Sequence, residues 1–411
     1  MKKVKFVSVI ILLSVIIIFP SCKKDNKSLR PVDNYDFSDT KSVSIINNCN
    51  DFGFNLFKYL YTNRTDSNVM LSPVSVALAL GMTYNGTAGT TKQAFETTLC
   101  LSGLSQHDVN RVYSNLMNHL LIADPNLLVA IANSIWYRNT FPVEQMFLDT
   151  NHFYYNAAIN PLDFNDPGAK DIINSWVAAQ TRNKIPEIIT TVTPDDVMFL
   201  INAVYFKGSW KYRFDPTQTT AMSFDLGNGT NVSANMMFQE DTFPEFQNNI
   251  FSAIELPYIL NKFSMIIMLP KSGKTINDIV TNLSSQNWNS WLNSFLERDM
   301  KVYLPRFKFA TSKTLNDALG ALGMGIAFTD GADFSGINPN VGLQITEVKH
   351  KTYIEVNEEG TEAAAVTSIG IGTTSMPENQ FMANHPFLFA IIDNKSKAVV
   401  FLGALGNPSV E

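Results

Sequence analysis

One run of small residues near the C-terminus constrains the fold of this 411-residue chain more than any other segment. The run begins at Glu358 and reads EEGTEAAAVTSIGIGTTS, with no proline before Pro377. Successive side chains of a strand point to opposite faces, so the run divides by parity. One face would carry only small or apolar side chains: Thr361, Ala363, Ala365, Thr367, Ile369 and Ile371. The run could therefore form a strand with one buried face, although its composition also fits a linker.

The segments on both sides of this run favour a place beside a packed sheet. Upstream, residues 344–356 are rich in β-formers and lead directly into Glu358. Downstream, residues 387–393 and 398–403 are apolar strand candidates joined by the polar turn Asp393-Asn394-Lys395-Ser396. A terminal linker would not be followed by two core strands. We therefore expect the run to be an exposed connection between buried strands.

Hydrophobic periodicity predicts helices and strands along the rest of the chain. We expect helices over Ile45–Tyr61, from Ser72-Pro73 onward and over Ile173–Arg182, and strands over Leu127–Tyr137, Met198–Phe206, Ile250–Leu256 and Phe263–Leu269. No repeat, charge block or Pro/Gly/Ser linker divides the body, which favours one large α+β domain.

The composition argues against nucleic-acid binding and against the common enzyme classes. The formal net charge is −6, so no basic footprint for nucleic acid is present. The sequence holds neither a Gly-x-Ser-x-Gly elbow nor a His-Glu-x-x-His metal motif. Residues 272–275 (SGKT) resemble the end of a phosphate loop, but Met268 stands where that loop needs its first glycine. We expect no catalytic residue, metal or cofactor.

The N-terminus predicts export. A basic start is followed by an apolar stretch, Phe6–Phe19, and then by Pro20-Ser21-Cys22. Residues 1–21 are predicted to be a signal peptide, and Cys22 is similar to the lipid-accepting cysteine of bacterial lipoproteins, with simple cleavage and release as the alternative. Polar residues 22–38 are expected to form a flexible tether, so that the folded domain spans 39–411. The predicted location is the outer membrane or cell surface, with the periplasmic face as the alternative.

Two further cysteines, Cys49 and Cys100, remain in the body of the chain. In an oxidising compartment they could form a disulfide. Two separate buried thiols fit the sequence slightly better, and both readings stay open.

Several motifs, in order, resemble those of the serpins, from about residue 40 to the C-terminus. The hinge run is joined by a helix-opening motif, a central-strand motif and three shorter matches: Asn68–Leu80, Ile201–Trp210, Glu255–Tyr258, Val302–Phe307 and His385–Phe389. The resemblance implies an α+β serpin fold, with a large, mostly antiparallel central sheet, surrounding helices and an exposed reactive loop.

The resemblance also implies a function. An inhibitory serpin is attacked by a serine protease as if it were a substrate, and the cleaved loop then inserts into the sheet and traps the acyl-enzyme. The chain would act as a monomeric, irreversible inhibitor, forming a covalent complex with its target. The alternatives are a non-inhibitory surface lipoprotein with a binding or chaperone-like role and, more remotely, a hydrolase.

The resemblance assigns site residues to three regions. The hinge consists of Glu358, Glu359, Gly360, Thr361, Glu362, Ala363, Ala364, Ala365, Val366 and Thr367. Trp210, Arg306 and Glu358 would lie where the sheet first opens. A polar cluster beneath the sheet would contain Ser72, Ser75, Asn202 and His350. The plainer alternatives are that Trp210 is a core residue and that His350 is an ordinary buried histidine.

The scissile bond of the loop follows from counting along the same pattern. Counting from Gly360 gives Thr374-Ser375, and counting back from His385 gives Ser375-Met376. We favour the first, because the hinge side sets the length of the inserted strand. Small uncharged residues there suit an elastase- or subtilisin-like protease, whereas a trypsin-like pocket needs Arg or Lys. A cysteine protease target stays open.

Overall fold

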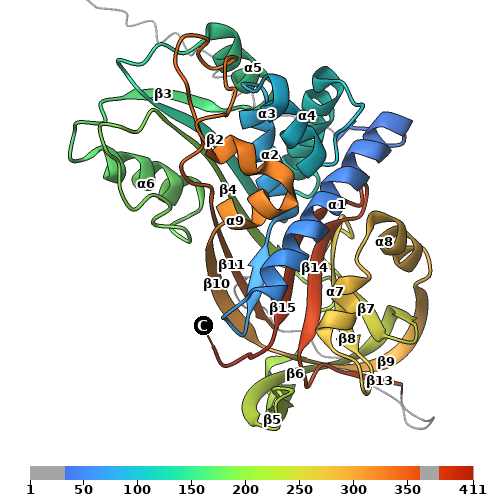
Figure 1. Cartoon of the computed structure of the whole chain (residues 1–411). Coiled ribbons are helices and arrows are strands. Elements are labelled where there is room, and N and C mark those ends of the chain that lie inside the picture. Colours follow the sequence, from blue (N-terminus) through green and yellow to red (C-terminus); the bar gives the residue numbers. More distant parts are fainter. Residues whose placement is uncertain (1–32, 362–378, 411) are drawn as a thin grey trace, which may run out of the picture. The chain divides into compact units, whose positions relative to one another are not determined.

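The computed structural model describes residues 33–361 and 379–410, which fold as one body (Figure 1). Cys22, hinge residues 362–367 and the expected scissile residues Thr374, Ser375 and Met376 lie outside the described residues. No helix in the described part is both long and apolar enough to cross a membrane.

A six-stranded sheet contains the start of the hinge. Its order is β10 (Phe307–Thr314), β11 (Lys349–Asn357), β12 (Gly360–Thr361), β4 (Met198–Ser209), β2 (Leu128–Arg138) and β3 (Ala158–Leu162). All neighbours are antiparallel except β2 and β3. Side chains of β4 alternate between two apolar layers, because Val204 and Phe206 join the main core whereas Ile201 and Ala203 face the other way. Both faces of this part of the sheet are therefore covered.

A second sheet forms the opposite layer of the core. Its path is β1 (Val69–Leu71), β15 (Val399–Leu405), β14 (Phe387–Asp393), β8 (Phe263–Pro270), β7 (Phe251–Pro257), β6 (Asn231–Gln247), β9 (Leu296–Pro305) and β13 (Gln380–Met382), with β5 (Thr220–Asp225) paired to β6. Every residue of β14 and β15 is buried, which explains their unbroken apolar sequences.

Helix α2 (Pro73–Tyr84) lies between the two sheets and contacts β4 on one side and β15 on the other. It begins where the sequence predicts, because Pro73 suits the first helical turn and the Ser72 hydroxyl accepts a hydrogen bond from the Ser75 amide at 3.3 Å. Helix α1 (Thr40–Thr62) packs against α2 and β15, which joins the start of the chain to its end (Figure 1).

Smaller helices cover the remaining surfaces of both sheets. Helix α6 (Ala169–Gln180) packs on β2, on the sheet face that carries Ile201 and Ala203 of β4. The other helices are α3 (Gly89–Thr98), α4 (Gln106–Ile122), α5 (Gln145–Tyr155), α7 (Ile276–Thr281), α8 (Ser285–Leu292) and α9 (Asn316–Leu319). This arrangement confirms the α+β class.

One predicted strand is wrong in its first half. The run 344–356 was expected to be β-structure throughout, but β11 begins only at Lys349. The backbone of 345–348 is instead bonded to neighbouring short helices: the Ile345 amide donates to the Ala327 carbonyl in the 3-10 helix Gly325–Phe328, and the Val348 amide donates to the Asn316 side chain at the start of α9. These bonds replace a sheet ladder, so alternation of side chains alone was misleading here.

The predicted flexible tether over 22–38 is also too long. Residues 33–38 are packed on the body, and the Phe37 side chain is buried against it. Burial of an aromatic ring offsets the entropy lost by ordering the backbone.

The two body cysteines, Cys49 and Cys100, for which a disulfide was left open, are free thiols in this structure, and burial raises the pKa of Cys49 to about 12.

Candidate functional site

The hinge begins inside the six-stranded sheet. Gly360 pairs with Asn357 of β11 and Ser209 of β4, and Thr361 pairs with Val356 and Gly208 of the same two strands. The expectation of an exposed connection is therefore wrong for its first residues: Glu358 is 4% exposed and Thr361 is 2% exposed. The two flanking strands already hold the entry point.

Close backbone packing at this point requires glycine. Gly360 has φ +150°, and a Cβ atom there would lie 2.0 Å from the Gly208 carbonyl oxygen. Gly208 is constrained from the other side, because its own Cβ would lie 2.0 Å from Leu127 Cδ2. Gly360 therefore allows β12 and β4 to approach within hydrogen-bonding distance, and Gly208 allows β4 to pack closely against Leu127.

An aromatic pair holds the buried hinge residues. The Tyr258 and Trp210 rings are stacked at 4.8 Å, with 20° between their planes. The Tyr258 hydroxyl is hydrogen-bonded to the Thr361 hydroxyl at 2.7 Å. The Trp210 indole donates to the Asn357 carbonyl at 2.9 Å, and its backbone amide donates to the Glu359 carbonyl at 2.9 Å. Trp210 therefore binds the hinge directly as well as filling the core.

The carboxylate of Glu358 is held by a cation and a hydroxyl. Arg306 donates to Glu358 Oε1 from Nε at 2.6 Å and from Nη2 at 2.5 Å, and the Thr219 hydroxyl donates to the same oxygen. Burial would raise the pKa of Glu358, but the bonds from Arg306 and Thr219 outweigh it and hold that pKa below its ordinary value. The three residues that the resemblance assigns to the sheet-opening region thus lie together.

The residues assigned to the polar cluster also lie together, beneath the middle of the sheet. The Ser72 amide donates to His350 Nε2 at 3.0 Å, and the Ser75 hydroxyl donates to Asn202 Oδ1. Because Nε2 accepts, the proton of the neutral imidazole is on Nδ1. Burial lowers the pKa of His350 to about 4, so the ring is neutral at pH 7.

The cluster continues into a chain of amides that the sequence did not reveal. The Asn202 side chain donates to Asn133 Oδ1 at 2.6 Å, and Asn133 donates to the Tyr155 carbonyl at 2.7 Å. The Tyr155 hydroxyl donates to Asn110 Oδ1 at 2.8 Å. This network joins the six-stranded sheet to helices α4 and α5 through satisfied buried groups.

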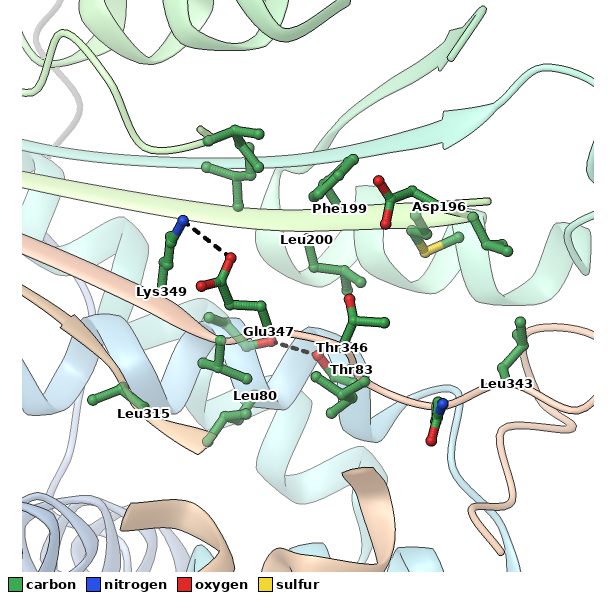
Figure 2. A pocket seen from close by; sticks show the side chains of 18 of the residues that line it. Leu80, Thr83, Asp196, Phe199, Leu200, Leu315, Leu343, Thr346, Glu347 and Lys349 are labelled. Atoms are coloured by element: carbon green, nitrogen blue, oxygen red, sulfur yellow. Dashed lines mark hydrogen bonds and ion pairs between the residues drawn. The ribbon is translucent and has the colours of Figure 1, made fainter. Parts of the chain in front are cut away.

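A cavity of about 530 Å³ lies below the paired hinge residues. It is bounded by the first half of β4, by segment 342–350 and by α2. Figure 2 shows Leu200 of β4 facing Thr346 and Glu347, with Leu80 and Thr83 of α2 as its floor. Within the part of the chain that the structure describes, no ladder joins β4 directly to β11. The sheet is thus open in its lower part, between residues 198–202 of β4 and segment 342–350.

Three residues of the site could not be predicted from the sequence: Thr219, Tyr258 and Asn133. Tyr258 belongs to a matching motif, yet nothing in the sequence pairs it with Thr361, 103 positions away. Thr219 lies 139 positions from Glu358, in a polar stretch without periodicity. Asn133 carries a weak signal, as an amide inside an apolar strand whose neighbours are mostly buried.

The chain matches the family model "Serpin (serine protease inhibitor)" over residues 47–408. The chain is a serpin. Among similar proteins, human Serpin B11 is 34% identical over 388 residues, covering 87% of this chain and 98% of that protein. The leukocyte elastase inhibitor of Xenopus laevis is 35% identical over 375 residues, covering 88% and 98%. Serpins are protease inhibitors and not enzymes, and in the described residues no group of His, Cys, Asp and Glu could hold a metal.

Two solved structures are similar over most of this serpin. The thermophilic serpin tengpin, in its native state, has a TM-score of 0.81 and 32% identity, covering 88% of this chain and 94% of that one. Human thyroxine-binding globulin, solved with thyroxine, has the same TM-score and 25% identity, covering 90% and 100%. The fold therefore occurs both in a named inhibitor and in a thyroxine-binding protein. The fold alone does not distinguish these two roles, whereas the geometry of the hinge bears directly on inhibition.

Proposed function

We propose that this serpin is an irreversible, suicide-type inhibitor of serine proteases. The observation that carries the proposal is the position of the hinge: Gly360 and Thr361 are already paired between β11 and β4, above an open cavity. A protease that cleaves the loop would free the chain that follows Thr361. That chain would extend β12 and carry the attached enzyme away from the site of attack.

The observed register predicts where each inserted residue would lie. Continued residue by residue, it sets Thr367 between His350 of β11 and Asn202 of β4. Because Thr361 faces the core, Ala363, Ala365 and Thr367 would face it as well. A hydroxyl would thus meet the polar cluster, while small methyl groups pass the tightly packed upper sheet. Ile369 and Ile371 would enter the cavity beside Leu200 and Met198, respectively.

The sequence of the loop supports a target with a shallow pocket. Thr374-Ser375 is the proposed scissile bond, with Ser375-Met376 as the alternative register. Small uncharged residues on both sides of the bond fit an elastase- or subtilisin-like enzyme, because they would fill a small binding pocket without an unpaired charge. Cysteine proteases are a second target class to be tested.

We also propose that the inhibitor is attached to a membrane. Cys22, after the apolar stretch Phe6–Phe19, would carry the lipid, and the short polar segment up to Val32 would connect it to the folded body. Ten residues between Cys22 and Asp33 reach about 35 Å when extended. The monomeric inhibitor would therefore act close to the membrane surface, on proteases of another cell or of its own.

The decisive experiment is incubation of the serpin with an elastase and, separately, with subtilisin, followed by denaturing electrophoresis and mass spectrometry. We expect a denaturant-resistant complex with the summed mass of the two proteins, and cleavage after Thr374. Trypsin, which needs a basic residue, is the matched control and should give no such complex.

Rapid cleavage of the loop with full retention of protease activity would refute inhibition of that enzyme. Papain, a cysteine protease, should be tested in parallel with elastase and subtilisin. If all three enzymes cleaved the loop and stayed fully active, the non-inhibitory alternative would stand, as a surface-binding protein with the same fold. A covalent complex with papain alone would move the target to the cysteine proteases.

A further inference from the structure

The first described residues form a strap along helix α4. We define this N-terminal strap as residues 33–39, which run from the C-terminal end of α4 toward its N-terminal end. Asp33 is bonded to His119 in the last turn of α4, whereas Asp39 lies 3.9 Å from Arg111, two turns earlier. Lys41, just after the strap, is paired with Asp108 at 2.6 Å.

His119 lies at the centre of the contact between the strap and the body. Its side chain is 1% exposed, and each ring nitrogen faces a carboxylate: Nδ1 is 3.0 Å from Asp33 Oδ1, and Nε2 is 3.0 Å from Asp393 Oδ1. Ionised carboxylates only accept hydrogen bonds, and both nitrogens can donate only when the ring is an imidazolium. The geometry therefore requires a charged histidine between two elements distant in sequence.

The charges around His119 balance only in that state. Asp393 is fully buried and accepts two further bonds, from the Ser396 amide at 2.7 Å and the Ser396 hydroxyl at 2.5 Å. Lys395 lies 3.0 Å from the other oxygen of Asp33. Two carboxylates thus face two cations when His119 is protonated. A neutral ring would leave a buried carboxylate without compensation, which is costly in an apolar environment.

Aromatic side chains of the strap shield this centre from water. Phe37 meets the His119 ring edge-on with 5.3 Å between centroids, and Tyr35 does so at 6.5 Å. Phe37 is buried in the main core. The rings and the ionic contacts fix the same few residues, so loss of the charge at His119 would loosen the strap as a unit.

We propose that His119 is a pH-sensitive clasp, which fixes the N-terminal strap to the serpin body when protonated and releases it when neutral. The groups that face it are Asp33 and Asp393, with Lys395 and, more distantly, Asp36 beside them. Its consequence is positional: the protonated clasp fixes Asp33, the first described residue, beside the C-terminal end of α4. This proposal is independent of protease inhibition.

The direction of the pH dependence follows from the contacts. Burial lowers the pKa of His119, but the bonds and charges of Asp393 and Asp33 outweigh it, so that the pKa is raised above its ordinary value of 6.5. Burial raises the pKa of Asp33, but the bonds from His119 and Lys395 outweigh it and lower that pKa. The clasp is thus complete below pH 6.5 and is lost as the pH rises through the raised pKa of His119. On the acid side it fails only below the lowered pKa of Asp33.

Two measurements on the full chain test the clasp. Selective ¹⁵N labelling of histidine should show both His119 ring nitrogens protonated at pH 7. Hydrogen exchange, corrected for the intrinsic pH dependence of exchange, should show protected amides at 35–38 that lose roughly ten-fold or more of their protection in Asp33→Asn, as expected for a charge-assisted bond. His107→Gln, an exposed histidine of the same helix, is the matched control and should change nothing.

The outcomes separate the possible arrangements. A singly protonated His119 ring at pH 7 would overturn the proposal, since the proton would then reside on a carboxyl group. Unchanged protection of 35–38 in Asp33→Asn would also overturn it, because the apolar rings alone would then hold the strap. If His119→Gln fails to fold, Asp33→Asn, which leaves the buried pair of His119 and Asp393 intact, still decides the question.

Discussion

Glu358 and His350 are two titratable groups beside the path of the proposed inserted strand, and their surroundings lower their pKa values for different reasons. Glu358 is ionised and held by Arg306, so its pKa is lowered although burial opposes this. His350 is buried without any charged partner, and burial alone lowers its pKa to about 4. Both shifts connect the protonation of single side chains to the stability of the sheet.

His350→Gln should make the serpin less sensitive to acid. The unfolded chain binds a proton at His350 below about pH 6.5, whereas the folded chain does so only below about 4, so the native state loses up to about 3 kcal/mol between these values. Glutamine can still accept the bond from the Ser72 amide but does not titrate. Denaturant midpoints measured from pH 7 to pH 4 test this. The exposed His152→Gln should retain the slope of the parent, and an unchanged slope in His350→Gln would show that His350 is not the group responsible.

Glu358→Gln should lower the free energy of unfolding by about 1–3 kcal/mol at pH 7, because the charge-assisted bonds from Arg306 are weakened in a buried position. The folded pKa of Glu358 is lowered, so its contribution is present above pH 4.5 and is lost as the pH falls through the folded pKa. The difference from the parent should therefore shrink in acid. Exposed Glu297→Gln is the control, and equal losses in both variants would contradict a specific ion pair.

At the scale of elements, β12 decides how the hinge is held. It contains two residues, is paired on both sides, and depends on the absence of a side chain at Gly360. Helix α2 provides the floor of the cavity through Leu80 and Thr83, and Ser72 and Ser75 at its N-terminus belong to the polar cluster. Changes in these elements should alter the behaviour of the loop without touching any residue that a protease would recognise.

Gly360→Ala should expel the hinge from the sheet. The new methyl group would collide with the Gly208 carbonyl at 2.0 Å, and β12 could then no longer pair with β4. Hydrogen exchange of amides 359–361 should increase by at least ten-fold. Gly342→Ala is the matched control, since a Cβ there meets nothing within 4 Å. Equal protection in both variants would mean that the strands can separate to admit the methyl group.

Thr361→Arg should convert the inhibitor into a substrate. Thr361 is already buried against Tyr258, so an arginine there, without a carboxylate partner, would expel β12 from the sheet and remove the pairs from which insertion would continue. We expect cleaved, unbound serpin to replace most of the covalent complex on denaturing gels. Glu362→Arg, whose side chain would have the opposite parity, is the control and should still form the complex. Full complex formation by Thr361→Arg would refute the parity assigned to the hinge.

The sequence was most informative where one local pattern determines the structure. β14 and β15 were predictable because burial on both faces demands unbroken apolar runs, and α2 because Ser72-Pro73 marks its start. Residues 344–348 were mispredicted because their backbone is bonded to Asn316 and Ala327, contacts that no periodicity encodes. The partners of the site residues were hidden for the same reason: Thr219 is recognisable only once folding places it beside Glu358.

At the scale of the whole molecule, the fold contains a cavity on the proposed path of the inserted strand. The six-stranded sheet carries apolar layers on both faces around β4, and the cavity lies between β4 and segment 342–350. If the cleaved loop fills that site, as proposed, the uncleaved protein is not at its most stable arrangement and persists kinetically.

Cleavage of the loop should therefore raise the thermal midpoint of the whole serpin. About ten additional backbone hydrogen bonds, at about 1 kcal/mol each, correspond to a rise of roughly 10–15 °C for a domain of this size. Calorimetry before and after cleavage by a protease that cuts the loop without being trapped measures this directly. The control is serpin incubated with the same protease in inactivated form. An unchanged midpoint after complete cleavage would exclude insertion of the freed strand.

The two paired residues of β12 also bear on the kinetics of trapping. Starting a new strand is the slow event in strand addition, because chain entropy is lost before hydrogen bonds repay it, whereas each later residue extends an existing ladder. In this serpin, Gly360 and Thr361 have made those first pairs before any protease arrives. The proposed insertion would thus begin as propagation from an existing nucleus. The delay before the acyl-enzyme is displaced would then depend mainly on how quickly β4 and β11 separate below it.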